Sequence, residues 1–355
     1  MRTIVSILLV AGLAGAQDQP RVQPGEDVNN VIIITTRFVI APVTVVDKNG
    51  KNVTGLTPLD FRLYDNGKLQ VITEDQATHP ISLAVAIQAS ADTTMILPQI
   101  QRTASLYDSL ILGDTGEMAV IGFDHRIQVQ TLGFTSDPAK IAEALKKLKP
   151  GSSQARLNDA AMEGINLLKN RPNNRKKILL LISESRDVGS ELHVRDVMTA
   201  AEFANVVVYS VDMSHLLTSL TTKAEPNRPS AIMPATRQLP GGNINTPTYD
   251  SQVNMGNWVP ALKEIFTATK AIFIQNPLEV YTKYSGGREY SFMSQRGLDQ
   301  AISDIGEELH SQYLLTYNPS NREGGFHEIV VQIALPEVKV RTRNGYWLAG
   351  AQAEK

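Results

Sequence analysis

Four short and almost continuous apolar stretches in the middle of the chain constrain its fold more than any other feature. Such stretches are typical of strands that are buried on both faces of a sheet. Segments with helical patterns separate most of them; in one, Asp137 and Pro138 form a helix start before apolar residues at steps of three and four. Alternating strands and helices predict an α/β fold with a doubly wound, mostly parallel sheet. The four stretches are Leu83–Ile87, Met118–Phe123, Ile178–Ile182 and Val206–Val211.

Further elements of this middle part follow from the same patterns. Met118–Phe123 and Ile127–Phe134 are expected to form a hairpin that adds one antiparallel edge strand. The remaining expectations are helices around 96–110, 157–168 and 193–203, a helix from about Val259 that closes at Gly286 and Gly287, a strand over 288–292 and a helix over 298–309.

Both ends of the chain have β character. Turn signals at 47–50 and 65–67 lie between apolar stretches, and an Asn-Gly pair favours a type I′ hairpin turn. Neither 31–78 nor 312–347 has enough strands to bury a core alone. We therefore expect them to pair into a second, small all-β domain resembling a sandwich, with the α/β domain (81–310) inserted between them. Residues 213–257, rich in proline, form an insert in that domain, read either as a partner-binding loop or as a tolerated insertion.

The first sixteen residues are typical of a secretory signal peptide. Arg2 precedes an apolar stretch from Ile4 to Leu13, and small residues end the segment at Ala16. The apolar stretch is shorter than the roughly 20 residues that span a bilayer, so cleavage after Ala16 is expected rather than an uncleaved anchor. Residues 17–30 form a polar, flexible leader. These features predict a secreted or periplasmic protein without a transmembrane segment in its mature chain, and the absence of cysteine suits that setting.

Composition and missing motifs exclude several functions. With 34 Lys+Arg against 36 Asp+Glu, the formal charge of −2 argues against binding nucleic acid non-specifically. There is no nucleophile elbow, phosphate loop, zinc helix or dinucleotide fingerprint. Gln88 follows the first buried strand, where an aspartyl-phosphate mechanism would need a nucleophilic Asp. The chain is therefore expected not to be an enzyme, with an envelope hydrolase of unrecognised site as the less favoured alternative.

Oxygen-bearing side chains follow the predicted parallel strands, at the sheet edge where ligands bind in doubly wound folds. They would suit a hard cation such as Mg²⁺. These residues are Gln88, Ser90, Asp92, Asp124, Ser183, Glu184, Asp187 and Asp212.

Several short motifs, taken in order from about Thr35 to Trp347, resemble a known family. They are Val53–Phe61 (VTGLTPLDF), Leu157–Ala160 (LNDA), Ser285–Arg288 (SGGR) and Ser311–Tyr317 (SQYLLTY). Together they are similar to von Willebrand factor A-type (VWA) domains, in particular those of exported bacterial proteins, including an acidobacterial group, in which a β region precedes the domain. The resemblance implies a VWA fold and protein binding.

The family's metal site consists of an Asp-x-Ser-x-Ser run, a Thr from a later loop and an Asp after the central strand. Only the first Ser of that set has a match here, at Ser90. The other positions fall on Gln88, Asp92, Ala155 and Glu184. Because Mg²⁺ needs near-ideal octahedral geometry, this degenerate set predicts no bound Mg²⁺ or Mn²⁺ and no other cofactor.

The expected function is therefore a non-catalytic protein-interaction module, used in adhesion or as a scaffold, with a protein partner in the envelope or extracellular space. The alternative that stays open is a metal-dependent VWA ligand binder with a rearranged cation site. The sequence does not name the partner.

Overall fold

The computed structural model describes residues 38–75, 79–214, 216–217, 258–268 and 274–348. The predicted signal peptide (1–16), the leader (17–30) and most of the proline-rich insert (218–257) lie outside the described residues. No helix within the described ranges is long and apolar enough to cross a membrane.

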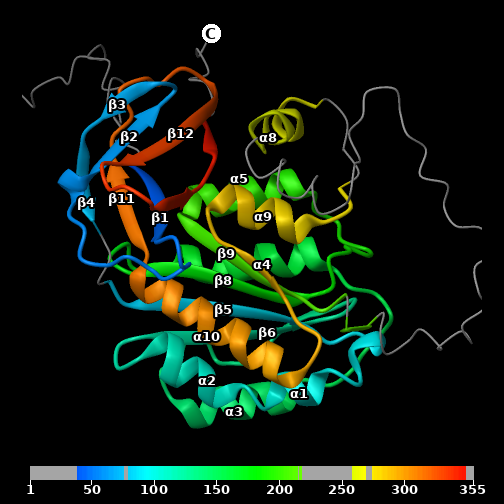
Figure 1. The fold of residues 1–355 in the computed structure, drawn as a ribbon. Coiled ribbons are helices and arrows are strands. Elements are labelled where there is room, and N and C mark those ends of the chain that lie inside the picture. The colour runs from blue at the N-terminus through cyan, green and yellow to red at the C-terminus, as the bar shows by residue number, and fades with distance from the viewer. Residues whose placement is uncertain (1–37, 76–78, 215, 218–257, 269–273, 349–355) are drawn as a thin grey trace, which may run out of the picture. The chain divides into compact units, whose positions relative to one another are not determined.

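A six-stranded sheet forms the centre of the middle part, as Figure 1 shows. Its strand order is β10-β9-β8-β5-β6-β7, and every neighbouring pair is parallel except β6 and β7. The prediction of a doubly wound, mostly parallel sheet with one antiparallel edge strand is confirmed. All residues of β5, β8 and β9 are buried, which explains their continuous apolar sequences. The strands are β5 (Ile81–Gln88), β6 (Glu117–Phe123), β7 (Ile127–Val129), β8 (Lys176–Ser183), β9 (Val206–Asp212) and β10 (Glu289–Ser291).

Helices cover both faces of this sheet. One face packs against α1 (Leu97–Gln101), α2 (Ala104–Tyr107), α3 (Pro138–Lys147) and α10 (Gln295–Ser311). The other packs against α4 (Leu157–Lys169), α5 (Val194–Ala204), α8 (Trp258–Thr267) and α9 (Pro277–Ser285). The predicted start of α3 is confirmed, because the Asp137 side chain accepts a hydrogen bond from the Ala139 N–H at 2.9 Å and Pro138 occupies the first helical position.

Two of the helix predictions are corrected. The segment expected as one helix around 96–110 is divided into α1, α2 and a π-helical turn, η3 (Asp108–Leu112). The break falls at Arg102 and Thr103, whose N–H groups donate three residues back, to the carbonyls of Gln99 at 3.3 Å and Ile100 at 3.1 Å. The Thr103 hydroxyl donates to the same Ile100 carbonyl at 2.6 Å.

The helix expected from Val259 to Gly286 is also two helices. The second begins anew because the Asn276 side chain caps the Glu279 N–H and Pro277 cannot continue a preceding helix. It ends at Gly286, as expected, in the left-handed conformation with φ of 87°.

The two ends of the chain form two antiparallel sheets. Their strand orders are β13-β1-β11-β4 and β14-β12-β2-β3, so each sheet combines strands from the N-terminal and C-terminal segments. Inward-facing residues of both sheets, such as Val43, Leu63 and Leu315, share one apolar core. Asn66 and Gly67 have positive φ in the β2–β3 hairpin, as the Asn-Gly signal predicted. The strands are β1 (Val39–Val46), β2 (Phe61–Asp65), β3 (Lys68–Gln70), β4 (Ile72–Asp75), β11 (Tyr313–Tyr317), β12 (Gly325–Ile333), β13 (Lys339–Thr342) and β14 (Gly345–Leu348); two 3₁₀ turns are η1 (Pro58–Asp60) and η2 (Ala91–Thr93).

Buried polar contacts connect these antiparallel sheets with the α/β part. The buried Lys176 ammonium at the start of β8 donates to the carbonyls of Leu309, at 2.8 Å, and Gln312, at 3.1 Å, where α10 leads into β11. The Trp347 N–H of β14 donates to the Glu202 carboxylate of α5 at 2.9 Å. At the opposite, carboxyl end of the parallel strands, the loops after β5 and β6 include both exposed and buried residues.

Candidate functional site

At the carboxyl end of the parallel strands, the side chain of Gln88 forms the centre of a buried hydrogen-bond cluster. Its Nε2 donates to Ser90 Oγ at 2.9 Å and to Glu184 Oε2 at 3.0 Å. Its Oε1 accepts from Ser183 Oγ at 2.9 Å and from the Glu184 N–H at 2.8 Å. A primary amide has two donors and two lone pairs, so the hydrogen-bonding capacity of Gln88 is completely used.

The structure thus brings together three of the five predicted positions, Gln88, Ser90 and Glu184. The other two have different environments. Asp92 lies exposed in η2, whereas the buried Ala155 forms a two-way backbone bridge with Val188, at 3.2 and 2.9 Å. The hydroxyl closest in sequence to Asp92 is that of Thr93, which is buried and donates to the backbone carbonyls of Gln88 and Ser90.

Asp124 is a buried carboxylate at the end of β6 that the family pattern did not include. Its Oδ1 accepts from the Arg126 N–H at 2.7 Å, and its Oδ2 accepts from the Ser152 N–H at 2.9 Å. Burial raises the pKa of Asp124, but these backbone donors and the adjacent His125 outweigh it, so the pKa lies below its ordinary value. The sequence signal for this role was the position of Asp124 directly after a buried strand.

Gly151 allows the loop before α4 to approach this carboxylate. A Cβ atom at position 151 would lie 1.9 Å from Asp124 Oδ2. The Gly151 N–H donates to the Ala89 carbonyl at 2.8 Å, and the Ala91 N–H donates to the Ser152 carbonyl at 2.8 Å. This loop therefore lies directly against the segment that carries Gln88 and Ser90.

Asp124, His125 and Ser152 resemble the residue types of a catalytic triad, but their geometry differs. His125 Nδ1 lies 2.9 Å from Asp124 Oδ2 and also 2.9 Å from Ser152 Oγ. In a working triad the carboxylate and the hydroxyl contact opposite ring nitrogens, so that the second nitrogen can accept the hydroxyl proton. With both contacts at Nδ1, this arrangement does not activate Ser152.

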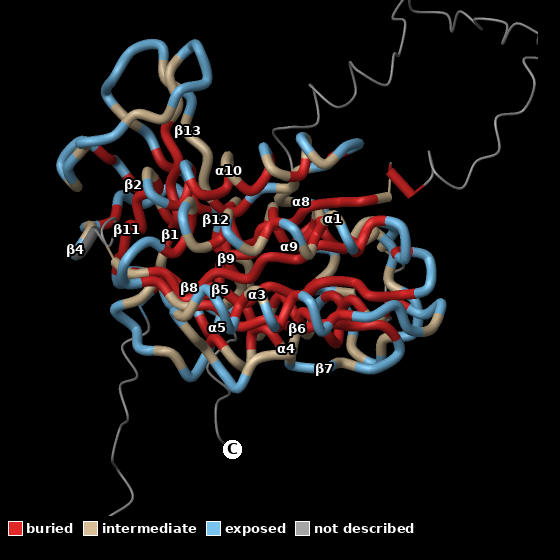
Figure 2. Tube along the Cα trace, turned by 90° about the horizontal axis from the view of Figure 1, so that it is seen from below, coloured by how far each residue is buried: buried red, intermediate tan, exposed pale blue. Residues whose placement is uncertain are grey.

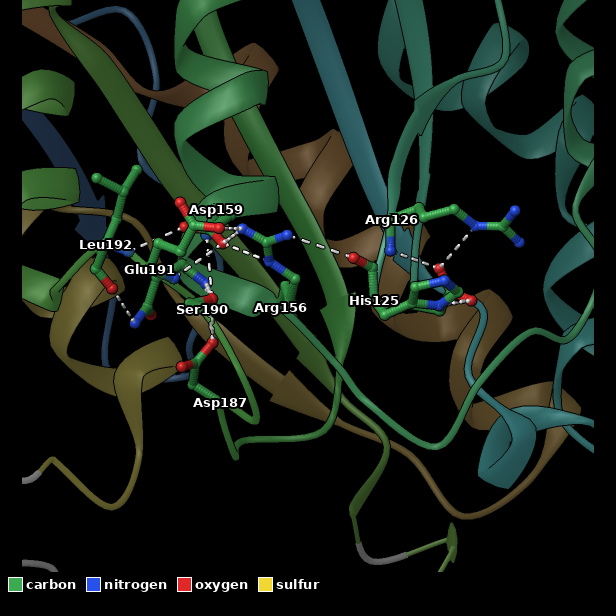
Figure 3. Close-up of polar contacts among 10 residues, drawn as sticks. His125, Arg126, Arg156, Asp159, Asp187, Ser190, Glu191 and Leu192 are labelled. Carbon is green, nitrogen blue, oxygen red and sulfur yellow. Dashed lines mark hydrogen bonds and ion pairs between the residues drawn. The ribbon is translucent and has the colours of Figure 1, made fainter.

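A second polar cluster holds the loop that follows β8 against the start of α4 (Figure 3). Arg156 Nε donates to Asp159 Oδ2 at 2.7 Å, and its Nη2 contacts Glu191 Oε1 at 2.9 Å. The two oxygens of Asp159 also accept from the N–H groups of Glu191 and Leu192. The hydrogen bond with Asp159 is the largest cause of a raised pKa for Arg156, so the guanidinium keeps its charge.

The N-terminal N–H groups of α4 are occupied by the same loop. Asp187 Oδ1 accepts from the Asn158 N–H at 3.1 Å and from Ser190 Oγ at 2.6 Å. Tyr281 of α9 donates to Asn158 Oδ1 at 2.6 Å, and burial raises its pKa well above the ordinary value. An anion could otherwise bind at such a helix start, but here Asp187 of the protein itself takes that place.

Among the described residues, no group of three or more Asp, Glu or His side chains has an arrangement that could hold a metal ion. The carboxylates at this edge are instead separated: Glu184 bonds Gln88, Asp124 bonds the loop with Gly151, and Asp187 caps α4.

No protein-family model matches the sequence, and no curated protein matches it. Several solved structures are similar in chain trace. The conserved hypothetical protein BatB from Bacteroides thetaiotaomicron is 14% identical with a TM-score of 0.37, over 64% of this chain and 99% of BatB. Proximal thread matrix protein 1 from the mussel byssus, solved with a zinc-occupied MIDAS motif, is 13% identical with a TM-score of 0.42, over 68% of this chain and 49% of that protein.

The vWF domain of the type V pili tip protein Mfa5 from Porphyromonas gingivalis is 16% identical with a TM-score of 0.26, over 31% of this chain and 39% of that domain. At these values the similarities carry no argument about ligands or activity. The fold class follows from the strand order and helix placement of this chain itself.

Proposed function

We propose that this protein is an exported, non-catalytic interaction module, used in adhesion or as a scaffold, and that it is built on a VWA-type domain with a degenerate metal site. The observation that carries the proposal is the complete use of the Gln88 amide. Its four hydrogen bonds, at 2.8 to 3.0 Å, tie β5 to the end of β8 where the family pattern has a charged Asp.

The orientation of this amide follows from its partners. The Glu184 backbone N–H can only donate, so the atom of Gln88 that faces it must be the oxygen, Oε1. Nε2 therefore points its two hydrogens toward Ser90 and the Glu184 carboxylate. N–H donors repel a cation, and the amide has no negative charge, so both effects oppose Mg²⁺ or Mn²⁺ at this position.

Two further observations support a binding module rather than an enzyme. The Ser152–His125–Asp124 group has both contacts at one ring nitrogen, which does not activate a nucleophile. The loops at the sheet edge are held by dense hydrogen bonding, as in the Arg156–Asp159 and Asp187–Ser190 pairs. A rigid loop surface loses little conformational entropy when a protein partner binds. Export is inferred from the signal-like residues 1–16.

The experiment that tests the proposal is cross-linked capture from the native envelope and medium with the full mature chain. We expect one defined set of partner proteins, retained equally in Mg²⁺ and in EDTA. Retention only with Mg²⁺ would favour the metal-dependent binder with a rearranged cation site. Turnover of an envelope component without a retained complex would favour the hydrolase.

A further inference from the structure

A groove of about 220 Å³ opens beside the edge strand β7. One wall consists of Arg126, Gln128 and Gln130, which alternate along the β6–β7 hairpin and so share one face of it. The segment from Lys147 to Gly151, which follows α3, forms the opposite wall. The groove is thus close to the candidate site, because Asp124 and Gly151 line both.

The groove has an excess of positive charge although the whole chain has a formal charge of −2. Arg126, Lys147 and Lys149 line it, and Asp124 is the one carboxylate among its lining residues. Asp124 offsets one of these three positive charges, so the lining keeps a net formal charge of +2.

The three cations are weakly paired within the protein. Lys147 contacts Glu143 at 2.9 Å, but both side chains are more than half exposed, and such pairs contribute little. The Arg126 guanidinium is 4.0 Å from Asp124. Lys149 takes part in none of the ion pairs of the described residues. An anionic ligand would therefore gain most of the attraction that these groups offer.

The strand next to the groove also has an unpaired backbone edge. β7 ends the six-stranded sheet, and Figure 2 shows it at the exposed margin. Gln130 donates its N–H to Val120, and Arg126 accepts from Asp124, so the even-numbered residues bond inward to β6. The backbone groups of Ile127 and Val129 consequently point away from β6. Such an edge can accept an extended peptide as an additional strand.

We propose that an extended, acidic segment of the protein partner adds to the free edge of β7 and that its side chains on the groove face of the sheet place carboxylates against Arg126 and, across the groove, against Lys147 and Lys149. This inference rests on the proposed interaction function and names the partner's chemistry. Alternate residues of an added strand face the same side, so the preferred segment has acidic residues at every second position. Three cations are few for binding a nucleic acid, which requires many neutralised phosphates.

The test uses a fluorescent peptide of alternating Glu and Thr, measured by anisotropy at low salt. The variant Arg126→Gln/Lys147→Gln/Lys149→Gln should weaken its binding about tenfold or more, since each exposed ion pair contributes about two- to fivefold. The control Lys51→Gln/Lys68→Gln/Lys339→Gln makes the same charge change at exposed positions of the antiparallel sheets and of the loop after β1, and it should alter the affinity by less than about twofold. Unchanged melting temperatures verify that all variants fold.

Two peptide controls separate the two parts of the inference. A peptide with Gln in place of Glu should bind about tenfold more weakly, because it lacks the carboxylates. A peptide with alternate backbone N–H groups methylated should also bind more weakly, because it cannot pair with β7. Equal binding of the Glu peptide to the wild type and the groove variant overturns the charge assignment, and equal binding of the methylated peptide overturns strand addition.

An oligothymidylate of the same length distinguishes a phosphate ligand. If the oligothymidylate binds more tightly than the Glu peptide, and if the groove variant no longer binds it, the acidic-peptide assignment is wrong.

Envelope capture separates this inference from the proposed function. If the groove variant still captures the partner, the groove is not the partner-binding site, and the interaction function stands. If the wild type captures no partner, the interaction function is wrong, and the peptide affinities still decide whether the groove binds acidic segments.

Discussion

Gln88 and Glu184, which are 96 positions apart in the chain, are joined by two hydrogen bonds of opposite direction. The Gln88 amide donates to the Glu184 carboxylate at 3.0 Å and accepts from the Glu184 backbone N–H at 2.8 Å. This reciprocal pair ties the carboxyl ends of β5 and β8 together. A neutral amide thereby takes the position at which the resembled family has a charged metal ligand.

The first prediction concerns the stability that this pair provides. Gln88→Met keeps the volume but leaves the Glu184 N–H without its acceptor, whereas the Ser183 hydroxyl can still donate to the Glu184 carbonyl at 2.8 Å. An unsatisfied buried polar group costs about 1–3 kcal/mol, so we expect a loss of about 1–3 kcal/mol in the free energy of unfolding, measured by urea denaturation. Gln128→Met, at an exposed position of β7, is the control and should change it by less than about 0.5 kcal/mol. Similar losses in both variants would contradict the role of Gln88.

The second prediction concerns metal binding. A cation at a concentration of 100 times its dissociation constant would stabilise a protein with a working site by about 2.7 kcal/mol. In a protein of this size, each kcal/mol raises the melting temperature by roughly 2–4 °C. We expect no such rise in melting temperature with Mg²⁺ or Mn²⁺ over EDTA. A clear rise with Mg²⁺ that disappears in Asp92→Ala would show instead that the altered residues bind the metal.

The third prediction concerns the close approach at Gly151. In Gly151→Ala the new methyl group meets the Asp124 carboxylate, and either the loop or the carboxylate must move. We expect a loss of about 1–3 kcal/mol in thermal or urea unfolding. Ser153→Ala, in the same loop and exposed, is the matched control.

A double-mutant cycle tests the cause. Because the clash is with the Asp124 side chain, adding Asp124→Ala to Gly151→Ala should cost less than it does in the wild type, a coupling of about 0.5–3 kcal/mol. Strict additivity of the two changes would show that Gly151 matters for another reason.

The fourth prediction concerns the pH dependence of stability. Burial raises the pKa of Glu289 from its ordinary 4.5 to about 7, with further contributions from Asp212 and Glu279 against a hydrogen bond from Asn276. The folded protein then holds the proton more tightly than the unfolded chain, so Glu289 favours folding at low pH. Its contribution falls as the pH rises from about 4.5 to 7, by at most about 3 kcal/mol.

Glu289→Gln removes this titration. We expect the variant to gain stability relative to the wild type above pH 7 and to differ little near pH 4.5, in unfolding curves recorded across that range. Glu328→Gln, at an exposed position of β12, should leave the pH profile unchanged. A variant that is equally destabilised at all pH values would mean that Glu289 acts through its hydrogen bond with Asn276.

The sequence by itself determined the features that depend on neighbouring residues. Continuous apolar stretches located β5, β6, β8 and β9, because strands buried on both faces have no polar alternation. Local chemistry also located the Asn66–Gly67 turn and the end of α9 at Gly286. The division of the segment expected as one helix around 96–110 was missed, because its apolar spacing is helical throughout, whereas the break at Arg102 and Thr103 consists of local hydrogen bonds three residues back.

The tertiary structure decided how these elements meet. That Gln88 bonds Glu184, that Asp124 lies against Gly151, and that Asp187 caps α4 are contacts between residues 27 to 96 positions apart. The sequence places these side chains at one sheet edge, but a shared ligand set and separate hydrogen-bonded pairs have the same sequence pattern. The difference depends on side-chain orientation and on the distances between loops, which are set by packing across the whole sheet and leave no periodic signal in the sequence.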